Sequence, residues 1–264
     1  MELPDRRLAS TRRLLGDSAM GRLRAGHAVV VGIGGVGSWA AEALARSGVG
    51  TLTLIDLDQI VESNINRQIH ALESTLGLAK VDAMAQRILQ IAPLATVRPV
   101  EQFVEPDNVA ELIPPQAGVV IDAIDSVPAK AALIAWCVAR SIPVICCGAA
   151  GGRRDPLRLT CDDLAHARGD SLLASLRSRL RRDYGFPAAA GASGADQARA
   201  RRFGVAAIHS TEPVDGEAPS GDAGAGQGGA PLACAGYGSI VTVTAAMGLA
   251  AASRAVDALG GPLR

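Results

Sequence analysis

Aromatic side chains are scarce in this sequence, at 3% of 264 residues, whereas apolar residues as a whole make up 48%. A buried core must therefore be built mainly from Val, Ile, Leu and Ala. The chain also lacks an excess of either charge, because 26 basic residues balance 26 acidic ones. Overall charge therefore indicates no class of partner, and the length allows one large domain or two small ones.

Paired cysteines are absent as well. The five cysteines, at positions 137, 146, 147, 161 and 234, form no CxxC pair and no cluster with histidine. This spacing argues against a structural zinc site and against a small disulfide-bonded scaffold.

Long apolar runs are also missing. The first seven residues contain no apolar signal core, and the most apolar late stretch, Ile240–Ala252, covers only thirteen residues. A membrane-spanning helix needs about 20 residues. We therefore expect a buried helix at this stretch and a soluble, cytoplasmic protein with reduced thiols and no membrane insertion.

Basic residues are unevenly distributed along the chain. Lys80 and Lys130 are the only lysines, and residues 151–202 contain eleven arginines against six aspartates, a local excess of five positive charges. Such a segment can bind a polyanion by releasing counterions. It can equally form a helix with solvated arginines, and the sequence leaves both interpretations open.

The most informative stretch is an apolar strand that runs into glycines and then into a helix, Val29-Val-Val-Gly-Ile-Gly-Gly-Val-Gly-Ser38. Gly32 allows a tight turn, Gly34 lets a phosphate approach the backbone, and Gly37 lets the helix pack close to the strand. A second strand ends at Asp56, about 20 residues further on, where an acid usually binds a ribose hydroxyl. The pattern predicts a nucleotide site without separating NAD from ATP.

Strand and helix patterns alternate through the first 150 residues. Strands are predicted at His27–Val31, Thr51–Asp56, Val97–Gln102, Gly118–Asp122 and Ile142–Cys146, and helices at Leu8–Leu23, Ser38–Ser47, Leu76–Ile91, Pro106–Leu112 and Val127–Arg140. This alternation predicts a Rossmann-like, doubly wound, mainly parallel α/β sheet with helices on both faces.

The pattern changes after Gly148. We expect residues 1–150 to bind the nucleotide and residues 151–264 to extend the fold as a C-terminal α/β portion of one continuous domain. This portion has a short strand (Leu157–Thr160), an arginine-rich helix (Ser171–Arg182) and the apolar helix named above. Residues 187–200 and 214–230 are rich in Ala and Gly, and we expect the second of these stretches to form a mobile loop.

Four polar features accompany the glycine loop: Asp56-Leu-Asp58, Asn64-Ile-Asn-Arg-Gln68, Lys80 and Asp122-Ala-Ile-Asp-Ser126. Because ligands of open parallel sheets bind beyond the carboxyl ends of the strands, we expect these features to share one edge. Arg67 and Lys80 are candidate cations for the phosphates of ATP. Asp125 with Asp122 suits Mg²⁺, which prefers one or two carboxylates together with waters and phosphate oxygens.

Each of these residues also has an ordinary structural interpretation. Arg67 could form a surface ion pair, Lys80 could be a solvated residue of a first helical turn, and the two aspartates could cap the following helix. Their order behind a glycine loop favours the functional interpretation of the whole set.

The chain resembles the ubiquitin-activating-like adenylating enzymes, a family that includes enzymes of molybdopterin and thiamine synthesis. The matching runs are Gly32–Trp39, Leu54–Asp58, Asn64–His70, Leu78–Lys80 and Ile121–Ser126. Further runs are similar to the subgroup that dehydrates threonylcarbamoyladenosine in tRNA, namely Asn66–Leu72, Val120–Ser126, Lys130–Ala135, Gly148–Gly152 and Ser210–Glu212.

The resemblance implies an enzyme that binds MgATP and transfers AMP to the carboxylate of a threonylcarbamoyl group on tRNA. A neighbouring group of the modification would then close a ring and release AMP, with net loss of water. The residues that the resemblance assigns to nucleotide binding are Gly32, Gly34, Gly35, Gly37, Asp56, Asp58, Asn64, Arg67, Gln68, Lys80 and Asp122. It assigns catalysis to Arg67, Lys80 and Asp125, and Mg²⁺ to Asp125 helped by Asp122; a monovalent cation is left open.

The resemblance further implies a homodimer in which Arg7 or Arg13 reaches the ATP of the partner. Two alternatives use the same nucleotide site. One is an activator of a small sulfur-carrier or ubiquitin-like protein, against which the missing zinc cysteines argue. The other is a sulfur-relay adaptor that acts through Cys234, although a small buried side chain is the favoured interpretation of this residue.

Overall fold

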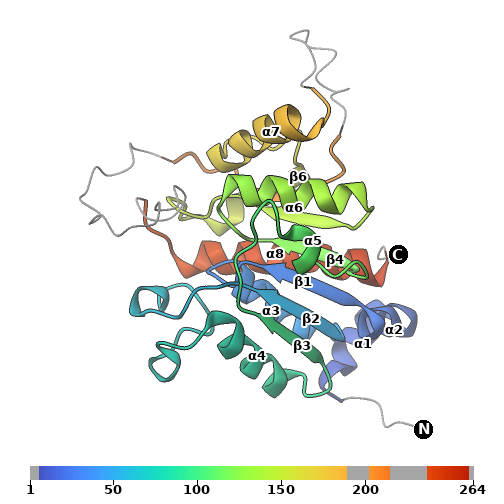
Figure 1. Ribbon diagram of the computed structural model, residues 1–264. Coiled ribbons are helices and arrows are strands. Elements are labelled where there is room, and N and C mark those ends of the chain that lie inside the picture. The colour runs from blue at the N-terminus through green and yellow to red at the C-terminus, as the bar shows by residue number, and fades with distance from the viewer. Residues whose placement is uncertain (1–5, 189–201, 215–236, 262–264) are drawn as a thin grey trace.

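The computed structural model describes residues 6–188, 202–214 and 237–261. Within these ranges, seven strands form one sheet in the order β3-β2-β1-β4-β5-β7-β6 (Figure 1). The strands are β1 (His27–Val31), β2 (Thr51–Ile55), β3 (Thr96–Val100), β4 (Val119–Asp122), β5 (Val144–Cys147), β6 (Leu159–Asp163) and β7 (Ala206–Ser210). Neighbouring strands are parallel except β6 and β7. The prediction of a doubly wound, mainly parallel sheet is confirmed.

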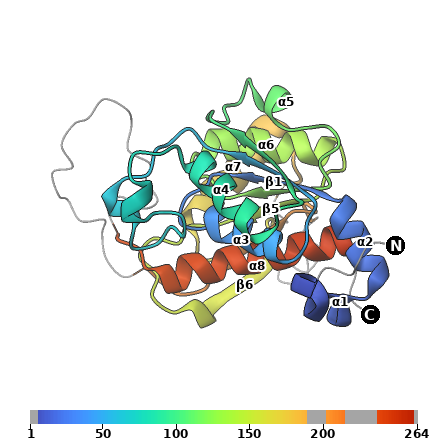
Figure 2. The same ribbon diagram turned by 90° about the horizontal axis from the view of Figure 1, so that it is seen from below.

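Helices cover both faces of this sheet. They are α1 (Ala9–Leu15), α2 (Asp17–Ala25), α3 (Gly37–Arg46), α4 (Lys80–Ile91), α5 (Val109–Leu112), α6 (Val127–Ala139), α7 (Ser171–Tyr184) and α8 (Val241–Gly260), with short 3₁₀ turns η1 (Arg6–Leu8), η2 (Glu62–Asn64), η3 (Glu73–Thr75) and η4 (Pro156–Arg158). Figure 2 shows α3 and α8 on one side of the strands and α5 and α6 on the other.

Alternation along the central strand explains this two-sided cover. In β1, Ala28 and Val30 pack into the cluster beneath α3, α4 and α8, whereas Val29 and Val31 pack into the cluster beneath α5, α6 and α7. A strand buried on both faces needs apolar residues at every position. The continuous apolar run of β1 is therefore typical of a strand inside the sheet, and β1 lies between β2 and β4.

Helix α8 runs from one end of the strands to the other. Near its start, the Thr244 methyl group lies beside Gly35 in the loop after β1. At its end, the carbonyl oxygen of Gly260 accepts a hydrogen bond of 2.9 Å from Arg22 Nε of α2. The last helix therefore packs against the glycine loop at one end and against the N-terminal helices at the other.

Several boundaries differ from those that the sequence predicts. The expected helix Leu8–Leu23 is divided at Gly16, whose φ of 82° is outside the helical region. The expected helix from Leu76 begins only at Lys80. Strand β6 extends to Asp163, beyond the predicted Leu157–Thr160, and helix α8 extends to Gly260 rather than Ala252.

The largest difference is strand β7, which was not predicted. Its sequence Ala-Ala-Ile-His-Ser is short and only weakly apolar, yet β7 lies between β5 and β6 in the sheet. Because β7 pairs with β5, residues beyond position 150 continue the same sheet as those before it. The predicted mobile loop at residues 214–230 lies almost entirely outside the described residues.

We predict that Gly37→Ala destabilises the fold. A methyl group at this position would lie 1.8 Å from the carbonyl oxygen of Gly32, so the loop or α3 must shift. The free energy of unfolding should fall by about 1–3 kcal/mol, as for other overpacked sites, and urea denaturation would measure it. Gly21→Ala is the matched control, because Gly21 lies in α2 with no atom within 4 Å of an added methyl group. Equal stability of the two variants would contradict the close packing described here.

Candidate functional site

The sequence-predicted residues converge on one edge of the sheet, where the strands end at their carboxyl ends. The strand order reverses between β1 and β4, because β2 lies on one side of β1 and β4 on the other. Such a reversal opens a crevice beyond the carboxyl ends of the two strands. The glycine loop follows β1, Asp56 follows β2 and Asp125 follows β4, so all three border this crevice.

Asp56 joins the glycine loop to the end of β2. Its Oδ2 accepts a hydrogen bond of 2.6 Å from Ile33 N, and its Oδ1 accepts one of 2.9 Å from Asp58 N. The residue is only 7% exposed. Burial raises the pKa of the Asp56 carboxyl, and the positive charge of Lys80 opposes that rise. Each carboxylate oxygen has a further lone pair, so Asp56 can still accept a hydrogen bond from a ribose hydroxyl.

Lys80 begins helix α4 and brings a cation to the same edge. Its Nζ lies 2.6 Å from Asp58 Oδ2, and its backbone nitrogen donates to the Asp58 carbonyl oxygen at 3.0 Å. Lys80 itself is buried, whereas the side chain of Asp58 is half-exposed. The ammonium group is therefore held in place by a carboxylate that solvent or a ligand can reach.

Arg67 lies against the glycine loop. A methyl group on Gly35 would be 3.3 Å from both Cγ and Cδ of Arg67, so the stem of the arginine covers this glycine. The carbonyl oxygen of Arg67 accepts a hydrogen bond of 2.9 Å from Trp39 Nε1 in α3. Its Nη1 donates to the carbonyl oxygen of Ser63 at 2.7 Å and to Asn66 Oδ1 at 2.9 Å. These contacts place the guanidinium beside the backbone that a phosphate would approach.

Asn64 and Gln68 lie one turn before and one residue after Arg67, and both are buried. The side-chain Oδ1 of Asn64 accepts a hydrogen bond of 3.2 Å from Val61 N. The backbone carbonyl oxygen of Asn64 accepts from Arg67 N and Gln68 N, each at 3.0 Å. Asn64 thus shapes the turn that presents Arg67. In the described part of the chain, Gln68 Oε1 has no hydrogen-bond partner.

The two aspartates after β4 occupy different environments. Asp122 is fully buried, and its Oδ1 lies 3.0 Å from Lys130 Nζ of α6. Lys130 also donates to the carbonyl oxygen of Ile124 at 2.8 Å. Burial would lower the pKa of Lys130, but the attraction of Asp122 outweighs it and the pKa is raised. Asp125 is partly exposed. Of the two carboxylates, Asp125 is therefore the one that a bound ligand can reach.

Sequence reasoning did not assign a role to Lys130. The pair that it forms with Asp122 links the end of β4 to the start of α6. Two signals were available: Lys130 is one of only two lysines in the chain, and it begins one of the runs that are similar to the dehydratase subgroup.

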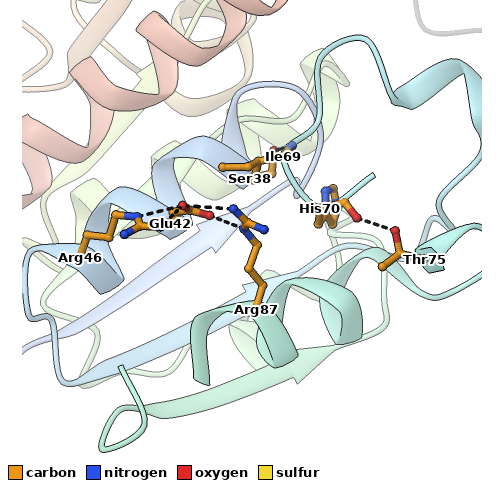
Figure 3. A network of polar contacts seen from close by, with 7 residues as sticks. All are labelled: Ser38, Glu42, Arg46, Ile69, His70, Thr75 and Arg87. Carbon is orange, nitrogen blue, oxygen red and sulfur yellow. Dashed lines mark hydrogen bonds and ion pairs between the residues drawn. The ribbon is translucent and has the colours of Figure 1, made fainter. Parts of the chain in front are cut away.

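A polar network ties α4 and the segment before it to α3 (Figure 3). Glu42 of α3 accepts hydrogen bonds from Arg46 Nε at 2.8 Å and from Arg87 of α4. Burial would raise the pKa of Glu42, but these two arginines outweigh it and the pKa is lowered. Ser38 Oγ accepts from Ile69 N at 3.4 Å. The helix that follows the glycine loop therefore positions both segments that carry Arg67 and Lys80.

His70 lies at the end of the Asn64–His70 run and is only 2% exposed. Neither ring nitrogen has a hydrogen-bond partner among the residues that the structure describes. Burial lowers the pKa of His70 to about 4, and the charges of Lys80 and Arg87 contribute in the same direction. The imidazole is therefore neutral at pH 7.

Buried thiols are not candidates for a nucleophile. Burial raises the pKa of Cys137 and of Cys147 to about 12, and that of Cys146 well above its ordinary value. A thiol attacks as its thiolate, so these three groups are unreactive at neutral pH. Cys234, the candidate for a sulfur-relay role, lies outside the described residues.

Two further classes of site are absent from residues 6–188, 202–214 and 237–261. No group of three or more His, Cys, Asp or Glu side chains is placed to hold a metal ion there. Nor does any helix of these ranges combine the length and apolar character that crossing a membrane requires.

We predict that His70 makes stability depend on pH. Between pH 6.5 and about 4 the unfolded chain binds a proton that the folded chain excludes. The stabilisation of the folded protein by neutral His70 is therefore complete above pH 6.5 and is lost as the pH falls toward 4. Between pH 7 and pH 5, urea denaturation of the wild-type protein should show a loss of about 2 kcal/mol from this residue. His70→Gln should lack that loss; the same pH dependence in both proteins would contradict the burial of a neutral imidazole.

Comparisons with known proteins extend this geometry. The model of the ThiF family matches residues 5–262. The chain is 45% identical over 256 residues to the tRNA threonylcarbamoyladenosine dehydratase of Escherichia coli (strain K12), covering 95% of this chain and 92% of that protein.

Crystal structures of the E. coli dehydratase are also similar to this chain. The complex with ATP has a TM-score of 0.81 at 43% identity and covers 95% of this chain and 92% of that one. The complex with AMP has a TM-score of 0.82 at 42% identity, with 97% and 96% covered. The family match spans nearly all of the sequence, and the chain therefore belongs to the ThiF family.

Proposed function

We propose that this protein is an ATP-dependent tRNA threonylcarbamoyladenosine dehydratase, which activates the carboxylate of the modified nucleoside by adenylation. The observation that carries the proposal is the convergence of Arg67, Lys80 and Asp125 beside a glycine loop. A dehydrogenase of similar fold needs neither this pair of cations nor the exposed carboxylate. The similarity to the E. coli dehydratase over 95% of the chain supports the same function.

The crevice between β1 and β4 brings together groups suited to the ribose and the phosphates of ATP. Asp56 accepts from the ribose, the loop glycines Gly32, Gly34, Gly35 and Gly37 leave the backbone open to phosphate, and Arg67 and Lys80 neutralise it. Asn64 and Asp58 position these two cations through the contacts described above. Gln68 adds a buried amide behind Arg67.

The chemistry requires no protein nucleophile. A carboxylate oxygen of the threonylcarbamoyl group attacks the α-phosphorus, and the bond to pyrophosphate breaks. A group of the same modification then attacks the activated carbonyl carbon and loses a proton, and AMP leaves with the former carboxylate oxygen. The cations act by stabilising the negative charge on the phosphoryl oxygens during transfer. They also reduce the repulsion between the incoming carboxylate and the triphosphate.

The residues present also fit a magnesium ion. Asp125 is a single, partly exposed carboxylate at the edge, which matches the preference of Mg²⁺ for few protein ligands and several waters and phosphate oxygens. Asp122 is buried at the start of the turn that carries Asp125, and Lys130 balances its charge. When bound, the ion would neutralise charge on the triphosphate.

The direct test is turnover of defined substrates. The protein is incubated with ATP, Mg²⁺ and tRNA that carries threonylcarbamoyladenosine, and both AMP and the mass of the nucleoside are followed. We expect one AMP for each nucleoside that loses water. Absence of both products would refute the proposal. ATP–pyrophosphate exchange that depends on a small carrier protein, and not on tRNA, would instead establish the alternative activity.

We predict that Arg67→Ala lowers the rate by about 100-fold or more, the usual effect of removing one group that stabilises developing charge. Arg24→Ala is the control, because Arg24 is an exposed arginine at the opposite end of the strands. Single-turnover formation of AMP measures the effect. A variant at Arg67 with the wild-type rate would remove this residue from the mechanism.

We predict that Asp125→Asn raises the Mg²⁺ concentration needed for half-maximal rate by at least about tenfold, since even outer-shell changes weaken metal binding by 10- to 100-fold. Asp257→Asn in α8 makes the same chemical change far from the crevice and should leave this concentration unaltered. Magnesium titration of AMP formation tests both variants. If the two titrations coincide, Asp125 does not hold the ion.

We also propose that two copies of the chain associate in the cytoplasm. Large apolar side chains are exposed along the segment that follows β2, at Leu57, Val61, Ile65, Leu72, Leu76 and Leu78. Leu8, beside Arg7, packs on Gly48 near the amino end of β2, so Arg7 lies at the opposite end of the strands from its own crevice. Arg7 could therefore reach only the ATP bound by a partner subunit, and not the ATP in the crevice of its own chain. Sedimentation velocity that shows a monomer at micromolar concentration would overturn the dimer.

A further inference from the structure

Four arginines in α7, in the turn before it and in the loop after β5 form no ion pair among the described residues. Arg153, Arg168, Arg177 and Arg181 form no ion pair with a carboxylate in the described part of the chain, unlike Arg179 and Arg182, which both pair with Asp183. We call the first four residues the arginine cluster. Figure 1 shows α7 as the outermost helix on the α6 side of the sheet, so one of its faces is open to solvent.

Contacts within the cluster bring its positive charges together. Arg177 and Arg181 are four residues apart on α7 and lie at the edge of its buried face, which Leu173, Leu176 and Leu180 form. Burial lowers the pKa of Arg177, and the positive charges of Arg181 and Arg168 lower it further. Arg181 is held by the carbonyl oxygen of Pro187 at 3.0 Å and by the ring of Phe203.

Arg153 is the least expected member. It is only 3% exposed, and of its guanidinium nitrogens only Nη2 has a hydrogen bond, to the carbonyl oxygen of Gly169 at 2.8 Å. Its Nε and Nη1, and Nη1 of Arg177, are buried without a hydrogen-bond partner among the described residues. A buried cation with unpaired N–H groups is costly unless an anion completes it.

Two nearby acids balance only part of this charge. Asp170 accepts from Ala149 N at 2.8 Å and from Leu173 N at 2.9 Å. Glu212 accepts from Arg154 N and Asp155 N, each at 2.9 Å. Asp170 also acts electrostatically on Arg177, and Glu212 on Arg153. Two carboxylates therefore face the four arginines of the cluster, and an excess of positive charge remains.

The cluster adjoins the nucleotide crevice. Ala149 and Arg153 belong to the loop after β5, the strand next to β4. In the same loop, Gly152 N donates to the carbonyl oxygen of Gly238, and the neighbouring Ser239 carbonyl oxygen accepts from Asn66 Nδ2 at 3.1 Å. A short path of bonded residues thus leads from the arginine cluster to Arg67.

We infer that Arg168, Arg177 and Arg181 bind backbone phosphates of the tRNA whose modified nucleoside enters the crevice, and that the buried Arg153 adds its positive charge to theirs. This inference rests on the proposed function. Guanidinium groups bind phosphate oxygens through paired N–H donors, and contacts to the nucleic-acid backbone position the polymer without reading its sequence. The α7 face would therefore hold the stem while the edge of the sheet holds the nucleoside.

The test compares two double variants of the same helix region that remove the same charge. The dissociation constant for tRNA is measured over a range of KCl concentrations, with the modified tRNA and with the same tRNA unmodified. Arg168→Gln with Arg177→Gln should weaken the binding of both tRNAs about tenfold or more at physiological salt. The slope of log Kd against log salt should fall by about 1–2, since each lost phosphate contact contributes about 0.7–0.9. Arg179→Gln with Arg182→Gln, which removes arginines paired with Asp183, should leave the slope unchanged.

Further measurements separate the inference from the function on which it rests. Affinity for ATP, measured by calorimetry, should be unaltered in both double variants. Arg168→Glu is a second probe, since this exposed side chain can change without disturbing the core, and it should weaken tRNA binding more than Arg168→Gln does. Wild-type affinity and slope in the Arg168/Arg177 variant, together with an active wild-type enzyme, would overturn the inference alone. A wild-type protein that binds no tRNA would overturn both proposals.

Discussion

The buried carboxylate of Asp56 accepts one hydrogen bond from the glycine loop and another from the residue that ends the turn after β2. The loop that a phosphate would approach and the acid that a ribose would meet are thereby fixed to each other before any ligand binds. Lys80 and Asp58 extend this arrangement to α4. Preorganised charges of this kind stabilise a transition state without rearranging during the reaction. Through Asp56, the glycine loop, Asp58 and Lys80 are fixed relative to one another.

The lysines and Arg67 are held in place by different contacts. Both lysines of the chain are buried, and each is paired with an aspartate, Lys80 with Asp58 and Lys130 with Asp122. An ammonium group is a compact charge that a single carboxylate can balance. Arg67 is held differently, because its guanidinium is hydrogen-bonded to the carbonyl oxygen of Ser63 and to Asn66. A planar guanidinium keeps several further donors that suit phosphate.

The regular half of the fold was predictable because its signals are local. The apolar run of β1, the glycines after it and the periodic pattern of α3 placed these elements to within a residue. Strand β7 and the pair between Asp122 and Lys130 were not predictable in this way. A short strand such as β7 is stabilised by neighbours distant in sequence, and a buried ion pair depends on which side chains the sheet brings together. The convergence of Arg67 on Gly35 likewise required the three-dimensional structure.

The chain also nearly closes on itself. Arg22 of α2 is hydrogen-bonded to the carbonyl oxygen of Gly260 at the end of α8, and Leu259 of the same helix approaches Gly26 and Gly118. Helices α2 and α8 thus meet at the end of the strands opposite the crevice. The contacts that anchor the N-terminal helices are therefore separated in space from the glycine loop, which packs against the other end of α8.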